Sequence, residues 1–107
     1  MARKHSRKST TDPAGKAALK ARVREWEKKV KVEVGEIHVR LMTKKWASMT
    51  SDGSRLTLNT ELLNQSPKFR DYVIVHELVH IHVPNHGKLF KTLMTVHLPG
   101  WEEIEKG

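Results

Sequence analysis

The chain has 107 residues, the length of a single domain, and it contains no cysteine, which excludes disulfide bonds and thiolate metal sites. Its net charge of +8 is unevenly distributed, because residues 1–31 hold 11 of the 20 basic residues and only 3 of the 12 acidic residues. No segment is apolar enough for a signal peptide or a membrane span, so we expect a soluble cytoplasmic protein without membrane contacts.

The N-terminal arm, residues 1–11, is polar and basic, and this composition is typical of a disordered segment. A positive arm attracts phosphate groups, which makes nucleic acid one candidate partner. A solvated tail is the simpler interpretation, since a run of charge alone is a weak signal. The remaining residues, 12–107, form the predicted single domain.

A helix is predicted from Asp12 to about Val30. Asp12 is a suitable N-cap, and Pro13 suits the first helical position. Four apolar residues follow at spacings of four, three and four: Leu19, Val23, Trp26 and Val30. These spacings place them on one face, so the helix packs on the body of the domain.

A small sheet is predicted after this helix. Residues 37–41 alternate, with Ile37, Val39 and Leu41 expected to face inward. Residues 55–59 form a second predicted strand after the turn signal at 51–53. The segment 44–49 between them is either a middle strand or a loop.

Two helices are predicted in the C-terminal half. The first runs from Lys68 to about His82, and it is apolar on nearly every face, which is typical of a buried helix. Pro84 ends it. The second runs from Gly87 to about His97, and residues 101–105 form a short tail. Together these elements predict a small α+β domain.

The candidate chemistry lies in the buried helix, where His76, Glu77 and His80 form a His-Glu-x-x-His motif. Histidines four residues apart lie on one helix face and can bind one metal ion, whereas Glu77, a quarter turn away, can reach a metal-bound water. Burying ionisable groups in an apolar helix is costly unless something compensates them, and a zinc ion does so. The alternative is a pair of core histidines bonded to the backbone.

A third ligand is required, and His86, six residues after His80, is the first candidate. The spacing of the three histidines is that of the metzincins, although Val83 stands where that class has glycine. Other residues weighed are His82, which points to another helix face, and three late glutamates: Glu102, Glu103 and Glu105. The remaining histidines are interpreted as packing or surface residues: His5, His38 and His97.

These motifs resemble the YgjP-like metallopeptidase domain, a family similar in pattern to SprT-like domains and to minimal gluzincin-type peptidases. The resemblance spans residues 36–101 and is most specific at 73–80, at 84–87 and at 46–59. It implies a minimal zincin-like domain with a three-stranded sheet beside the active-site helix. It also implies zinc ligation by His76, His80 and His86, with Glu77 as the catalytic glutamate. The chain departs from the family at 46–49, where Trp-Ala-Ser-Met replaces the usual Trp-Gly-Ser-Cys.

The predicted function is therefore that of a zinc metalloendopeptidase, in which Glu77 is the general base for a zinc-activated water. A peptide or protein substrate is expected to pair with the edge of strand 55–59. One alternative is a zinc-dependent endoribonuclease of the YbeY-like type, whose motif lacks the glutamate. Another is a DNA-associated module with structural zinc, which needs a fourth protein ligand.

Overall fold

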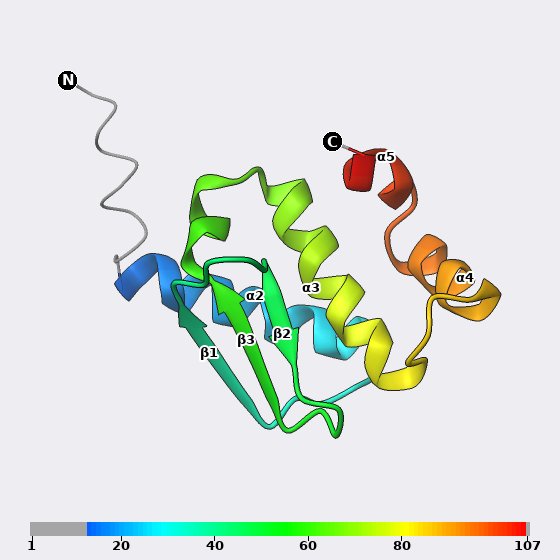
Figure 1. Ribbon diagram of the computed structural model, residues 1–107, viewed down its shortest axis with the longest axis horizontal. Helices are drawn as coiled ribbons and strands as arrows, with labels where there is room; N and C mark the ends of the chain where they lie inside the picture. Colours follow the sequence, from blue (N-terminus) through cyan, green and yellow to red (C-terminus); the bar gives the residue numbers. More distant parts are fainter. Residues whose placement is uncertain (1–12, 107) are drawn as a thin grey trace.

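The computed structural model describes residues 13–106 and confirms the α+β class (Figure 1). The elements in chain order are α2 (Pro13–Val30), β1 (Glu36–Arg40), β2 (Ala47–Met49), β3 (Arg55–Asn59), the 3₁₀ helix η1 (Thr60–Asn64), α3 (Pro67–His82), α4 (Lys88–His97) and α5 (Trp101–Lys106). The expected arm 1–11 and the N-cap Asp12 lie outside the described residues. None of the described helices is both long and apolar enough to cross a membrane.

Helix α3 lies between the sheet and the two C-terminal helices (Figure 1). The hydroxyl of Ser66 accepts the N–H of Phe69, and Pro67 follows as the first helical residue, so the start is well capped. The helix ends before Val83, whose extended backbone precedes Pro84. The predicted limits of this helix are confirmed to within one residue.

The sheet has the order β1-β3-β2, in which β3 pairs parallel with β1 and antiparallel with β2. Strand β3 is therefore central, and both of its edges are already hydrogen-bonded. The prediction that a substrate pairs with residues 55–59 is wrong, because a central strand has no free edge. Strand β2 pairs with β3 only, so its outer edge is free of any other described strand, and it lies beside α3 (Figure 1).

One face of the sheet is buried beneath the helices, and the other is open. On β1, Ile37 and Val39 are buried, whereas Glu36, His38 and Arg40 are exposed. Leu41, expected to face inward, is 63% exposed. The strand ends at Arg40, so the alternation of side chains no longer applies to the next residue.

The core forms where the apolar stripe of α2 meets the sheet and α3. The four predicted residues of α2 are all buried: Leu19, Val23, Trp26 and Val30. Several side chains of α3 are fully buried: Ile74, Val75, Leu78 and Val79. Each such aliphatic side chain stabilises the fold by about 1.5–3 kcal/mol relative to an exposed one, and α3 is thereby fixed as the rigid centre of the domain. The C-terminal residues 101–106, expected as a tail, form the short helix α5.

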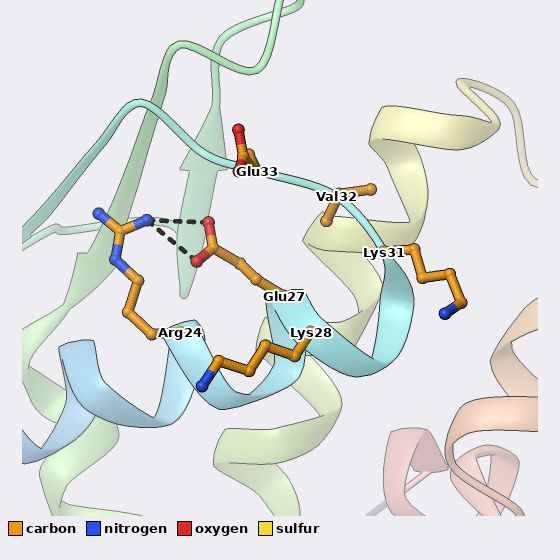
Figure 2. Close-up of a pocket in the computed structure, with 6 residues that line it drawn as sticks. All are labelled: Arg24, Glu27, Lys28, Lys31, Val32 and Glu33. Carbon is orange, nitrogen blue, oxygen red and sulfur yellow. Dashed lines mark hydrogen bonds and ion pairs between the residues drawn. The ribbon is translucent and has the colours of Figure 1, made fainter.

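Two ion-pair networks hold α2 in place. At its C-terminal end, the buried Glu27 accepts the N–H of Val34 at 2.6 Å and both carboxylate oxygens face Arg24 (Figure 2). Further along, Asp71 of α3 accepts two hydrogen bonds from Arg22, each 2.8 Å, and one from the indole of Trp26 at 3.0 Å. Each of these carboxylates is paired within the protein, so we interpret both networks as structural.

Candidate metal centre

Three imidazoles converge at one point beside α3. The Nε2 atom of His86 lies 2.9 Å from Nε2 of His80 and 3.3 Å from Nε2 of His76. His76 and His80 come from one face of α3, and His86 follows the turn that leads into α4. In residues 13–106, these three form the one group of at least three metal-binding side chains whose ligand atoms lie within 4.8 Å of one another. The structure thus brings the two histidines of the motif together with His86, and their role as metal ligands stays a prediction.

The spacing of these nitrogens fits a transition-metal ion. Two nitrogens that bind one tetrahedral zinc at about 2.0–2.1 Å lie about 3.3 Å apart, close to the separations observed here. Imidazole ligands with no thiolate suit zinc and several other transition ions. The donor set therefore fits the metal that the motif implies.

The orientation of His80 is fixed by the end of its own helix. Its Nδ1 lies 3.1 Å from the carbonyl oxygen of Val83, to which it donates a hydrogen bond when that nitrogen is protonated. This tautomer leaves the lone pair of Nε2 free for a metal. Burial lowers the pKa of His80, and the neighbouring His76 and His86 lower it further, which favours the neutral ring that a ligand needs.

Phe90 of α4 forms the floor of the cluster. Its ring stacks on His80 at 4.8 Å between centroids and meets His76 and His86 edge-on at 5.3 Å and 4.7 Å. Only 2% of Phe90 is exposed, so the imidazoles rest on a rigid apolar support. Such packing holds ligand rotamers in place before a metal binds.

Glu77 is partly buried beside the cluster, with a carboxylate oxygen 3.5 Å from Nδ1 of His76. It is absent from the converging group, as its place in the helix predicts. Its carboxylate is thus near the ligands without being one of them. This is the arrangement that a general base beside a metal site requires.

The other candidate ligands do not belong to the converging group of described residues. The ring of His82 bonds the carbonyl of Val30 at 2.9 Å and ties the end of α3 to the end of α2. His38 pairs with Glu36 on the open face of the sheet, and burial lowers the pKa of His97 near His82. Glu102, Glu103 and Glu105 do not belong to the converging group.

A cavity of about 230 Å³ opens onto the cluster, lined by His76, His86 and Phe90 together with Trp101 and Glu105 of α5. Burial and then the Glu105 carboxylate raise the pKa of Tyr72 to about 12, so this phenol stays protonated at neutral pH. Helix α5, which was predicted only as a short tail, therefore borders the site.

An aromatic stripe leads from the sheet to the metal centre. Trp46 meets Phe69 edge-on at 5.1 Å, Phe69 lies 6.1 Å from Tyr72, and Tyr72 lies 5.7 Å from His76. Trp46 directly precedes β2, and the other three residues share one face of α3. The free edge of β2 and the histidines thus border the same side of α3.

Comparison with known proteins identifies the family. The YgjP-like, metallopeptidase domain family matches residues 3–107. The chain belongs to this family. The YgjP-like family implies a catalytic metal, and the protein is accordingly a metallopeptidase-type hydrolase.

Solved structures agree with this assignment. The metallopeptidase zymogen jannalysin of Methanocaldococcus jannaschii is 26% identical with a TM-score of 0.74, and the match covers 82% of this chain and 90% of that chain. The metallopeptidase zymogen abylysin of Pyrococcus abyssi is 19% identical with a TM-score of 0.71, covers 82% and 89%, and supports the fold alone. No curated protein matches this YgjP-like chain closely enough to count as a relative.

Sequence reasoning missed two supports of the site. The carbonyl of Val83 is a backbone group, and no side-chain pattern marks it. Phe90 belongs to the apolar face of its helix and differs in no sequence signal from a core residue. The hydrogen bond with His80 assigns the Val83 carbonyl to the metal centre, and the packing of α4 on α3 assigns Phe90 to it.

Proposed function

We propose that this YgjP-like protein is a zinc endopeptidase in which His76, His80 and His86 hold the ion and Glu77 is the general base. The observation that carries the proposal is the convergence of three imidazole nitrogens with a carboxylate directly beside them. Three protein ligands leave one position of a tetrahedral zinc for water or substrate, which is typical of catalytic sites.

Zinc, when bound, lowers the pKa of a water and polarises the scissile carbonyl. The protein's own contribution is positional. Glu77 lies where its carboxylate can take a proton from that water and later deliver it to the leaving amine. The Val83 carbonyl keeps His80 in the required tautomer, and Phe90 holds the three rings in place.

The substrate backbone is proposed to pair with the outer edge of β2. An edge strand offers unpaired N–H and C=O groups, and an extended peptide can add to it as a further strand. The aromatic stripe from Trp46 to His76 supports this placement, because it joins the start of β2 to the metal centre.

The nonpeptidase alternatives have weaker support. A structural zinc module requires four protein ligands, whereas the cluster supplies three among residues 13–106. A ribonuclease of the YbeY-like type has no need of Glu77, which borders the cluster here. Contact of the basic arm with nucleic acid remains a separate proposal, tested by the salt dependence of DNA binding before and after deletion of residues 1–11.

Latency is also part of the proposal, because both solved relatives are zymogens. In this chain Trp101 and Glu105 of α5 line the cavity that leads to His76. A latent protein binds zinc but hydrolyses slowly, so zinc content is the primary measurement and hydrolysis the second.

The first experiment measures metal by elemental analysis of protein purified without added metal. We expect about one zinc per chain in wild type and in the control His38→Ala, and a large loss in His86→Ala. An unchanged zinc content in His86→Ala would contradict the ligand assignment. Absence of a transition metal from wild type, even after zinc is supplied, would end the zinc proposal.

The second experiment measures hydrolysis of an unfolded protein substrate. Glu77→Gln should retain zinc and lose activity by about 10²–10⁴-fold, the range for a general base. A Glu77→Gln protein that cleaves at the wild-type rate would refute the proposed role of this carboxylate. Internal cleavage sites in the products distinguish an endopeptidase from an exopeptidase.

A further inference from the structure

A second concavity, of about 450 Å³, lies on the open face of the sheet, away from the histidines. We define it as the basic pocket: Arg40, Lys44, Lys45, Ser48 and Thr57, together with the loop residues 41–43. Arg40 ends β1, the lysines belong to the loop that follows, and Ser48 and Thr57 come from β2 and β3. Three cations thus share this pocket with the strand hydroxyls of Ser48 and Thr57.

Among residues 13–106, the cations of the basic pocket have no ion-pair partner. No acidic residue lines this pocket, and Arg40, Lys44 and Lys45 form no ion pair with another residue in the described range 13–106. The concavity at the end of α2 is different, because its Arg24 is bonded to Glu27 (Figure 2). A cluster of unpaired cations in a concave surface attracts anionic groups.

Thr57 adds a hydroxyl donor to the basic pocket. The residue is only 7% exposed, yet it lines the basic pocket. No fully buried side-chain oxygen in the described part of the chain lacks a hydrogen-bond partner, and the Thr57 hydroxyl, which makes no such bond there, is open to the pocket. A hydroxyl that opens onto a pocket can donate a hydrogen bond to an oxygen of a bound group.

The basic pocket is continuous with the free edge of β2. Ser48 is the central residue of that strand and pairs with Thr57 of β3. Its neighbours Ala47 and Met49 pack against the core, so Ser48 points to the open face. In a peptide that pairs with β2, every second side chain lies on this same face, on the side of the basic pocket.

We infer that the basic pocket binds acidic side chains of a peptide that lies along β2, and that it gives the peptidase a preference for acidic substrates. This inference rests on the proposed function. A peptide is favoured over nucleic acid because the pocket shares Ser48 with the edge strand, and because no aromatic side chain lines it for base stacking. Carboxylates accept hydrogen bonds from the cations and from both hydroxyls.

The test measures peptide binding rather than hydrolysis. Full-length Glu77→Gln protein, which preserves the scaffold, is titrated into two fluorescein-labelled peptides that alternate Thr with Glu or Thr with Gln, and anisotropy is recorded. We expect the Glu peptide to bind about tenfold more tightly than the Gln peptide. The added triple substitution Arg40→Gln, Lys44→Gln, Lys45→Gln should abolish this difference.

Two further variants make the assignment specific. Thr57→Val keeps the side-chain shape and removes the hydroxyl, and it should weaken the Glu peptide about threefold. A matched control carries three glutamine substitutions at exposed lysines elsewhere, Lys20→Gln, Lys68→Gln and Lys106→Gln. It should retain most of the tenfold preference. Equal loss in this control would assign the effect to net charge and overturn the inference.

Two other outcomes would also overturn it. The first is a Glu peptide that binds the triple variant as well as it binds the parent protein. The second is single-stranded DNA of equal charge that binds more tightly than the peptide and depends on the basic pocket, which would assign the pocket to nucleic acid. Failure of the proposed peptidase function appears separately, as retained hydrolysis in Glu77→Gln, and leaves this binding measurement unaffected.

Discussion

The metal centre and the contact between α2 and α3 are both clusters of ionisable side chains, but they are built in opposite ways. At the helix contact, Asp71 is bonded by Arg22 and Trp26, so donors and acceptors match within the protein. At the metal centre, the Nε2 atoms of His76 and His80 converge on Nε2 of His86, and the Glu77 carboxylate approaches only the opposite nitrogen, Nδ1, of His76. Matched partners indicate a scaffold, whereas convergent lone pairs indicate a ligand from outside.

The largest expected effect is the stabilisation of the fold by metal at the histidine cluster. On the proposed assignment zinc binds the folded chain and not the unfolded one, so zinc at about 1,000 times its Kd should raise the free energy of unfolding by about 4 kcal/mol. Thermal unfolding with zinc and with a chelator measures the difference. His76→Ala should remove most of this gain and His38→Ala should not. If zinc raised the free energy of unfolding equally in His76→Ala and in wild type, the histidine cluster would not be the zinc site.

The next largest effect concerns the contact between α2 and α3 at Asp71, which we call the matched cluster because its donors and acceptors pair within the protein. Asp71→Asn removes the charge that receives two bonds from Arg22 and one from Trp26, and should lower the free energy of unfolding by about 1.5–3 kcal/mol. Denaturant unfolding at neutral pH measures this loss. Zinc content should stay at the wild-type value, since Asp71 touches none of the three histidines in the described structure. A parallel loss of zinc would mean that the two clusters are coupled through α3.

The sequence predicted the grouping of the three histidines better than the order of the strands, because the grouping depends on residues close together in the sequence. His76 and His80 are placed by one helix, and the short turn after it places His86, so local periodicity is sufficient. Strand order depends on pairing between distant segments, and no local pattern showed that residues 55–59 are central. The exposure of Leu41 follows from a strand end, which is the least reliable feature of a sequence pattern.

A smaller effect is expected at Glu27, near the C-terminal end of α2. Glu27→Gln keeps one oxygen to accept the N–H of Val34 but weakens the contact with Arg24, whose side chain is about half exposed. We expect a loss of about 1 kcal/mol, measured by denaturant unfolding beside Glu25→Gln as a more exposed control on the same helix. A loss as large as that of Asp71→Asn would show that the connection to β1 is as important as the contact with α3.

The smallest effect is the pH dependence that Asp71 contributes. Burial alone would raise the pKa of this carboxyl, but bonds from Arg22 and Trp26 outweigh burial and hold the pKa below its ordinary value of 3.8. A lowered pKa in the folded state means that the stabilisation is fully present above the ordinary pKa and is lost as the pH falls through the folded value. Because the two influences oppose each other, the pH-dependent part is smaller than the hydrogen-bond loss in Asp71→Asn.

This prediction is checked by unfolding curves between pH 2 and pH 6 in the presence of a chelator, which separates the carboxyl from zinc binding. Below about pH 4, stability should fall more steeply in wild type than in Asp71→Asn, and the difference in slope should not exceed about 1.4 kcal/mol per pH unit, the limit for one proton. Identical slopes would mean that burial and bonding cancel at Asp71. The matched cluster would then stabilise the fold by its geometry alone, with no net electrostatic preference for the charged form.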